Sequence, residues 1–327
     1  MQDSSNNYSS DVNQLNTLVE KTQLLKQEIG KIIIGQEDII DQVLISIFSK
    51  GHCLLVGVPG LAKTLLVNTI SSALGLSYNR IQFTPDLMPS DIVGSEVLDE
   101  NRRFKFIKGP IFANIILADE INRTPPKTQA ALLEAMQEHS VTVSGHTNIL
   151  EEPFFVLATQ NPIEQEGTYP LPEAQLDRFM FMLWLDYPSF EEEINILKAT
   201  TTGKDVKVNK ILSKEEIILM QDLIRKIPVT DNVYEYAVRL VEKTRVSTPN
   251  VHPIAQKYLS WGAGPRASQY LIIGAKCHAV LKGKYSPDIE DVKAVAVSVL
   301  RHRIVQNYSS QADGYTAEKI IIDLINS

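Results

Sequence analysis

The residues with the clearest chemical potential form the stretch Gly57-Val58-Pro59-Gly60-Leu61-Ala62-Lys63-Thr64. An apolar run at 53–56 precedes it, and a helical pattern that begins at Leu65 follows it. In such a strand–turn–helix unit, backbone N–H groups converge on an anion, a lysine adds positive charge and a hydroxyl ligates Mg²⁺. The spacing therefore predicts a phosphate-binding loop, with Lys63 on the phosphates and Thr64 on the metal.

One position departs from the usual form of this loop, G-x-x-x-x-G-K-[ST]. Ala62 stands where the second glycine is expected, so the backbone there must adopt a conformation that a residue with a Cβ can reach. Taken alone, the stretch also fits a Gly-Pro turn ahead of an unrelated helix.

A second group of candidate residues lies at the ends of two later apolar runs. Asp119 and Glu120 follow the run at 114–118, and Asn161 follows the run at 153–158. Beside a phosphate loop, Asp119 can hold the metal through water, and Glu120 can orient and polarise an attacking water. Asn161 can hydrogen-bond the terminal phosphate or that water. The alternatives are an ordinary acidic turn and ordinary Asn-Pro turn chemistry.

Alternating strand and helix patterns up to about residue 187 indicate how these side chains are positioned. Strand-like apolar runs occur at 53–56, 79–83, 114–118, 153–158 and 179–185. Five such runs with crossovers predict an α/β domain whose parallel five-stranded sheet is flanked by helices. Helical patterns at 12–29 and 38–48 precede the sheet, with a break at Gly35-Gln36.

After Tyr187-Pro188 the strand pattern stops. Helical patterns follow at 189–201, 214–226, 231–246, 266–282, 288–302 and 316–325. We therefore expect three parts: an N-terminal tail and helix at 1–34, the nucleotide-binding α/β domain at 35–187, and an all-helical domain at 188–327. The polar residues at the N-terminus are expected to be a frayed tail.

Two segments between the strands are predicted to form hairpins that project from the sheet. The first, at 96–106, has a polar turn at Asp99-Glu100-Asn101, and the second lies at 141–149. They can be plain surface loops or can engage a substrate, and the residues alone leave both open.

The composition is consistent with a cytoplasmic enzyme. Of 327 residues 44% are hydrophobic, and Lys+Arg 32 against Asp+Glu 39 gives a net charge of −7. No basic field therefore favours nucleic acid or anionic membrane. The polar N-terminus is unlike a signal peptide, no apolar run is long enough to span a bilayer, and two cysteines give no disulfide framework.

Several other residues are interpreted as structural. The six histidines lack metal-ligand spacing, Trp184 and Trp261 are expected to pack in the interior, and Arg301-His302-Arg303 is expected to form a solvated helix face.

The residues of these motifs and their order along the chain resemble those of MoxR-type AAA+ ATPases. The resemblance covers the chain from Gly35 to about Arg303. Besides the phosphate loop, it is carried by the stretches Lys108-Gly109-Pro110-Ile111-Phe112-Ala113-Asn114, Leu117-Ala118-Asp119-Glu120-Ile121-Asn122-Arg123, Pro125-Pro126-Lys127-Thr128-Gln129, Leu132-Leu133-Glu134-Ala135-Met136-Gln137-Glu138, Ala158-Thr159-Gln160-Asn161-Pro162, Leu171-Pro172-Glu173-Ala174-Gln175-Leu176-Asp177-Arg178-Phe179 and Gly264-Pro265-Arg266-Ala267. That family tolerates alanine at the position of Ala62.

The resemblance implies roles for residues that the pattern alone does not assign. Gly35 and Gln36 would touch the adenine of ATP or ADP. Asn161 would be the sensor 1 residue and Arg266 the sensor 2 residue at the start of a lid helix. Arg178 would be an arginine finger that reaches the γ-phosphate held by the neighbouring subunit. The resemblance also implies, on less specific grounds, that Arg123 acts between subunits. The two hairpins would lie near a central pore.

The function implied is that of an ATP-driven remodeller acting on a partner protein, in its maturation, assembly or metal loading. The resemblance further implies a homo-oligomeric ring, a hexamer, and partners that bear a von Willebrand factor A domain. A trans arginine predicts slow hydrolysis by the monomer and faster hydrolysis on assembly. The alternatives are a nucleic-acid motor or transcription activator, which the net charge disfavours, and a monomeric P-loop kinase, which the helical lid disfavours.

Overall fold

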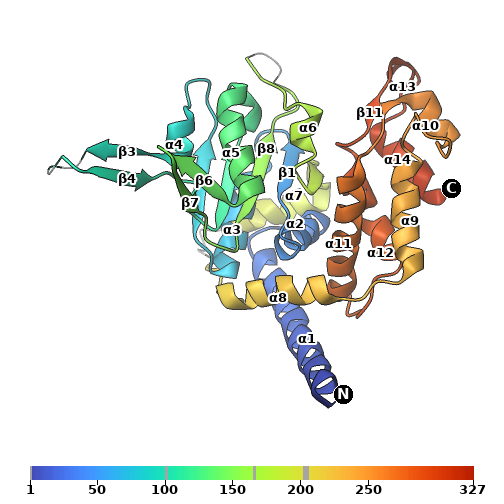
Figure 1. Ribbon diagram of the computed structural model, residues 1–327, viewed down its shortest axis with the longest axis horizontal. Coiled ribbons are helices and arrows are strands. Elements are labelled where there is room, and N and C mark those ends of the chain that lie inside the picture. Colours follow the sequence, from blue (N-terminus) through green and yellow to red (C-terminus); the bar gives the residue numbers. More distant parts are fainter. Residues whose placement is uncertain (1, 99, 101, 165–166, 202–205) are drawn as a thin grey trace.

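The computed structural model describes residues 2–98, 100, 102–164, 167–201 and 206–327. Its central element is a five-stranded sheet in the order β2-β5-β8-β1-β9, with parallel neighbours throughout (Figure 1). The strands are β1 (Cys53–Gly57), β2 (Tyr78–Gln82), β5 (Ile115–Asp119), β8 (Phe155–Gln160) and β9 (Phe181–Leu185). The prediction of a parallel five-stranded sheet from five apolar runs is thus confirmed, with bounds that differ by up to two residues.

The sheet separates two apolar cores because successive residues of a strand face opposite sides. In β1, Cys53 and Leu55 join the core that includes the helices α1 (Gln2–Gly30), α2 (Glu37–Phe48) and α3 (Lys63–Leu74). Leu54 and Val56 join the core under the helices α4 (Pro89–Val93) and α5 (Pro126–Glu138). A strand buried on both faces has to be apolar throughout, which is why the inner strands β1, β5 and β8 could be recognised as apolar runs.

Helix α1 begins at Gln2, so the expectation of a frayed tail is wrong. Leu18, Leu25 and Ile29 of this helix are buried in the core. Once a turn is fixed by packing, each further helical residue adds a backbone hydrogen bond without a new nucleation penalty, so the helix extends into polar sequence.

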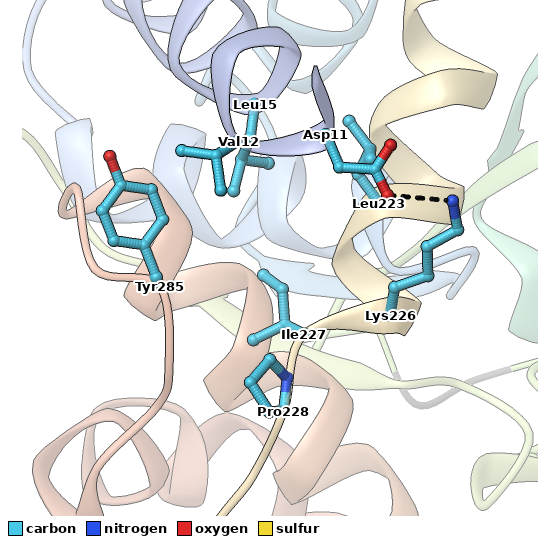
Figure 2. A pocket seen from close by; sticks show the side chains of 8 residues that line it. All are labelled: Asp11, Val12, Leu15, Leu223, Lys226, Ile227, Pro228 and Tyr285. Atoms are coloured by element: carbon cyan, nitrogen blue, oxygen red, sulfur yellow. Dashed lines mark hydrogen bonds and ion pairs between the residues drawn. The ribbon is translucent and has the colours of Figure 1, made fainter. Parts of the chain in front are cut away.

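The outer part of α1 rests on the C-terminal half of the chain. Figure 2 shows Val12 and Leu15 facing Leu223 of α8 (Lys214–Lys226), with Ile227 beyond it. At the edge of this contact Lys226 Nζ lies 3.3 Å from Asp11 Oδ2. The N-terminal helix therefore packs against α8 of the C-terminal half as well as against α3 beside the sheet.

The C-terminal half is largely helical, as predicted. Its elements after α8 are α9 (Asp231–Glu242), α10 (Pro253–Tyr258), α11 (Pro265–Leu281), α12 (Ile289–Leu300), α13 (Tyr308–Ala312) and α14 (Ala317–Asn326), with α7 (Phe190–Thr200) before it. It is not wholly helical, because β10 (Leu259–Trp261) and β11 (Val305–Gln306) form a short antiparallel pair. Strands of two or three residues are too short to leave an alternating pattern in the sequence.

Both predicted hairpins are present. The first consists of β3 (Gly94–Leu98) and β4 (Phe104–Lys108), and the second of β6 (Ser140–Val143) and β7 (His146–Ile149). The predicted turn at 99–101 lies partly outside the described residues. Figure 1 shows the β3–β4 hairpin extending away from the body of the molecule, and Leu98 and Phe104 near its end are exposed.

Candidate nucleotide-binding and catalytic site

The predicted phosphate loop (57–64), called the phosphate loop below, connects the end of β1 with the start of α3. Gly57 lies so close to β9 that a Cβ there would come within 2.8 Å of the Leu185 Cβ. Gly60 has φ +88°, in the region that favours glycine. Gly57 thus allows a close approach to β9, and Gly60 allows a backbone turn that residues with a Cβ rarely adopt.

Ala62 adopts the left-handed conformation, with φ 55° and ψ 26°, directly before α3. An L-residue with a Cβ pays about 1–2 kcal/mol in that region, so the loop keeps the backbone path of a glycine at this position. As the N-cap of α3, Ala62 offers no side-chain hydrogen bond to the helix. The first-turn N–H groups, including those of Thr64 and Leu65, are therefore not capped by that side chain and suit an anion.

Lys63 is folded back in this state, and its Nζ donates to the carbonyl oxygen of Gly57. Burial lowers the pKa of Lys63, while the charges of Asp119 and Glu120 act in the opposite direction. The ammonium group is thus near both carboxylates that the sequence assigned to this site.

Asp119 ends β5 and is held from two sides. Its Oδ1 accepts a hydrogen bond of 2.6 Å from Thr159 Oγ1, and its Oδ2 accepts from Arg80 Nη2 at 2.6 Å and Nε at 3.1 Å. The same Thr159 hydroxyl accepts from the backbone N–H of Glu120 at 2.9 Å. Thr159 therefore links the two acidic residues to the adjacent strand β8.

Glu120 is restrained by two donors on one oxygen. Its Oε2 accepts from Gln82 Nε2 at 2.8 Å and from Arg123 Nη1 at 3.1 Å. Arg123, which the resemblance associated weakly with subunit contacts, here pairs with a carboxylate of its own chain. In this arrangement both donors engage the same carboxylate oxygen, so they restrict how the group can turn toward a water.

Arg80 and Gln82 were not predicted as site residues. Both lie on β2, two residues apart and therefore on the same face, and Gln82 stands in register with Asp119 of β5. The signal in the sequence was the pair of polar residues at alternate positions of a strand that was otherwise interpreted as an apolar run.

Asn161 directly follows β8, which lies between β5 and β1 in the sheet. It is buried, and its Oδ1 accepts from the backbone N–H of Ile163 at 3.1 Å. The strand order therefore places Asn161 between the acidic pair and the phosphate loop, at the same edge of the sheet.

Beside the loop a hollow of about 480 Å³ is lined by Gly35, Gln36, Ile39, Trp184, Leu185 and Tyr187, among others. Leu185 is the residue that Gly57 approaches, so the hollow adjoins the phosphate loop. The expectation that Trp184 and Trp261 pack in the interior is wrong, because their exposed fractions are 48% and 70%. Trp184 provides an aromatic wall to the hollow that contains the predicted adenine-contacting residues.

Arg178 and Arg266 lie together, but not beside the phosphate loop. They line a small hollow with Lys50 and His52, which precede β1. Arg178 precedes β9, whose first residue is in register with the first residue of β1. Because the strands are parallel, both arginines lie at the edge of the sheet opposite to the loop, about 15 Å away by the rise of five strand residues.

Both arginines lie where the C-terminal helical part of the chain, which we call the lid, meets the part that contains the sheet. Arg266 Nη1 lies 3.0 Å from Asp177 Oδ2, and Tyr270 of α11 donates through its hydroxyl to the carbonyl oxygen of Arg178 at 3.3 Å. We call Arg178, Arg266 and the hollow that they line the arginine edge.

The interpretation of Arg301-His302-Arg303 as a solvated helix face is wrong. Helix α12 ends at Leu300, and the chain then turns into the boundary between lid and sheet, where His302 and Arg303 are both 6% exposed. Burial lowers the pKa of His302 well below its ordinary value, and its Nε2 donates to the carbonyl oxygen of Phe179. The positive charges of this stretch suggested a surface position. The sequence does not show that the helix ends before these residues or that the turn after it is buried.

Comparison with known proteins agrees with this geometry. Residues 52–181 match the family described as ATPases associated with various cellular activities, and residues 252–324 match the AAA lid domain. Within the described residues, no helix is both long and apolar enough to cross a membrane.

Three related proteins cover most of the chain. The chaperone MoxR1 of Mycobacterium tuberculosis is 43% identical over 90% of this chain and 78% of its own length. The uncharacterized protein YeaC of Bacillus subtilis is 42% identical over 92% of each chain. The crystal structure of a protein from Cytophaga hutchinsonii, assigned as an ATPase, has a TM-score of 0.91 with 41% identity and covers 98% of both chains. By this similarity, and by the phosphate loop and acidic pair that the structure assembles, the chain belongs to the MoxR family of AAA+ ATPases.

Proposed function

We propose that this protein hydrolyses ATP with Mg²⁺ at the contact between two copies of itself, and uses the energy to remodel a partner protein. The family supports ATPase activity of a chaperone type in general. The proposal adds the reaction at a subunit contact and the residues that perform it.

The residues present fit a magnesium nucleotide. The open first turn of α3 and the glycines of the loop suit the phosphates, with Lys63 as the local cation. Thr64 would offer its hydroxyl oxygen to Mg²⁺, and Asp119, whose carboxylate accepts from Thr159 and Arg80, would hold the metal through water. When bound, the metal neutralises charge on the phosphate oxygens. The hollow beside Gly35 and Gln36 suits the adenine, with Trp184 as an aromatic surface.

The observation that carries the proposal is the separation of the arginine edge from the phosphate loop. Phosphoryl transfer requires positive charge around the equatorial oxygens of the transferred group, and a trans arginine contributes about 10³–10⁵ in rate. Arg178 and Arg266 cannot supply that charge within one chain, because the length of β1 lies between them and the loop. A second copy can supply it if its arginine edge faces the phosphate loop of the first.

The remaining roles belong to residues of one chain. Glu120 orients the attacking water and accepts its proton after leaving Gln82 and Arg123, with which it is paired in the present state. Asn161, at the same sheet edge, donates through its amide to the terminal phosphate or the water. Lys63 turns from the Gly57 carbonyl toward the phosphates.

We further propose a closed homo-oligomeric ring, a hexamer, that acts in the cytoplasm on a protein partner, with a von Willebrand factor A domain protein as the first partner to test. The relative named as a chaperone supports a protein partner in general. The exposed β3–β4 hairpin is the element that we expect to face the pore.

The test is complementation between two inactive variants. The Arg178→Ala protein has an intact phosphate loop and Glu120, but the arginine edge that it presents to a neighbour is defective. The Glu120→Gln protein presents an intact arginine edge, but it cannot hydrolyse the ATP in its own site. Each alone should lose at least a hundredfold in kcat, and a mixture should recover activity well above the sum of the two. Arg239→Ala, which removes an exposed arginine of α9 paired with Glu235, is the control and should behave as the unchanged protein.

Two results would refute a shared site. One is a mixture with no more activity than its components, although both variants assemble. The other is ATPase activity per subunit that stays constant from dilute, unassembled protein to concentrations at which it assembles.

A further inference from the structure

The segment 177–180 lies between α6 (Glu173–Leu176) and β9 and contains Arg178. Residues of the lid form hydrogen bonds to it. Arg303, just after α12, is at the centre of this contact. Its Nε donates to Asp177 Oδ1 at 2.7 Å, and its Nη2 donates to the carbonyl oxygens of Asp177 at 2.9 Å and Phe179 at 2.6 Å. One lid side chain therefore bonds to the residues on both sides of Arg178.

All five N–H donors of this guanidinium have an acceptor. The Nη1 group donates to the carbonyl oxygen of Met180 at 3.2 Å and to that of Val299, which completes the set with the three bonds above. The side chain is 1% exposed and lies over the ring of Tyr270, with 5.0 Å from the guanidinium carbon to the ring centroid. A buried charge is tolerated when every donor is satisfied, and the planar fork then fixes the acceptors relative to one another.

The same contact reaches both residues of the arginine edge. Asp177 binds Arg303 through Oδ1 and Arg266 through Oδ2. Tyr270, whose ring supports Arg303, donates to the carbonyl oxygen of Arg178. The carboxylate of Asp177 and the ring of Tyr270 thus tie the two arginines to one buried cation.

We propose that Arg303, through Asp177 and Tyr270, is the positioning residue that sets Arg178 and Arg266 as one unit against the neighbouring copy's nucleotide. The inference rests on the proposed trans site and adds the reason why that site depends on the lid. Arg178 precedes β9 and Arg266 is in the lid, and Arg303 makes four of the hydrogen bonds that fix their relative placement, beside those of Arg266, Tyr270 and His302.

The competing interpretation is that Arg303 merely stabilises the fold. The two interpretations differ in what they predict for a well-folded variant. A structural role lowers stability without selecting any step of catalysis. A positioning role lowers kcat and leaves nucleotide affinity unchanged, because the phosphate loop and the hollow beside Gly35 belong to the opposite edge of the sheet.

The central variant is Arg303→Lys, which keeps the positive charge but loses the planar fork. A misplacement of about 1 Å in a catalytic group can reduce the rate about 10²-fold. We expect kcat to fall between 10- and 100-fold, while the Kd for a fluorescent ADP analogue stays within twofold. Arg301→Lys is the matched control, because Arg301 is two residues away in the lid and pairs with Glu318 rather than with 177–180.

The decisive readout is complementation with Glu120→Gln. The Arg303→Lys copy has an intact loop and acidic pair, so a Glu120→Gln neighbour should supply a correctly placed arginine edge and restore activity. No recovery by Arg303→Lys, under conditions in which Arg178→Ala does recover, would overturn the inference. If Arg178→Ala also fails to recover, the proposed shared site is what fails.

Tyr270→Phe decides the question if Arg303→Lys does not fold. This variant keeps the ring beneath the guanidinium and removes only the hydrogen bond to the Arg178 carbonyl oxygen. A fall in kcat of at least threefold that a Glu120→Gln neighbour reverses supports the inference. An unchanged kcat overturns it.

Discussion

Replacing Ala62 by glycine should stabilise the protein, although it removes a methyl group from a helix N-cap. Ala62 is exposed and has φ 55°, so the substitution loses little apolar burial and relieves a left-handed alanine. That relief amounts to about 1–2 kcal/mol. The greater entropy of glycine in the unfolded chain offsets about 0.5–1 kcal/mol of it. The expected net change in the free energy of unfolding is therefore a gain of about 0.5–1 kcal/mol.

Ala130→Gly provides the matched control. Ala130 is also exposed, but it lies inside α5, where glycine lowers stability by about 1 kcal/mol relative to alanine. Urea unfolding of the three proteins should give transition midpoints in the order Ala62→Gly, unchanged protein, Ala130→Gly, with equal slopes. If Ala62→Gly is destabilised as much as Ala130→Gly, the assignment of a strained loop at this position is wrong.

Three further perturbations test other parts of the site. Gln82→Ala removes one of the two donors to the Glu120 carboxylate. Because Glu120 is a quarter exposed, we assign about 1 kcal/mol to that hydrogen bond. Its loss should free Glu120 to engage the attacking water and raise basal kcat by up to about fivefold. His52 is buried and its pKa falls from 6.5 to about 4, chiefly because burial disfavours its charged form. Below pH 6.5 the unfolded chain therefore binds a proton that the folded chain does not, and stability should fall by up to about 3 kcal/mol as the pH drops from about 6.5 to about 4. Urea midpoints across this range should be less pH-dependent in His52→Gln. In a Trp261→Phe background, ADP should change the emission of Trp184.

Each of these has a contrary outcome. A Gln82→Ala protein with lower basal activity would mean that Gln82 assists Glu120 rather than restraining it. An identical pH dependence in His52→Gln would place the acid sensitivity elsewhere. For the fluorescence measurement the control is Trp184→Phe, which leaves only Trp261; a stronger ADP response in that protein would locate the nucleotide away from the hollow.

The sheet and the phosphate loop could be predicted because their chemistry is local. A doubly buried strand must be apolar along its whole length, so β1, β5 and β8 stand out in the sequence. Asp119 ends β5 and Lys63 begins the helix that follows the loop after β1, and the parallel sheet brings the ends of these strands together.

The lid–core boundary could not be predicted in the same way. Arg303 was assigned to the surface because charged side chains are seldom buried without partners. Its partners are mainly backbone carbonyl oxygens near residue 178, and a carbonyl has no signature in the sequence. Trp184 was misplaced for the opposite reason, because a large aromatic is usually buried, whereas here it borders an open hollow.

The placement of the phosphate loop and the arginine edge on opposite ends of the strands gives each molecule a direction. Two copies that share a reaction centre in this way meet head to tail, through unlike surfaces, and such a contact repeats until rotation closes it. An arc of copies that failed to close would always contain one terminal member whose nucleotide lacks an arginine donor. Closure would then determine not only the shape of the assembly but also whether every member can work.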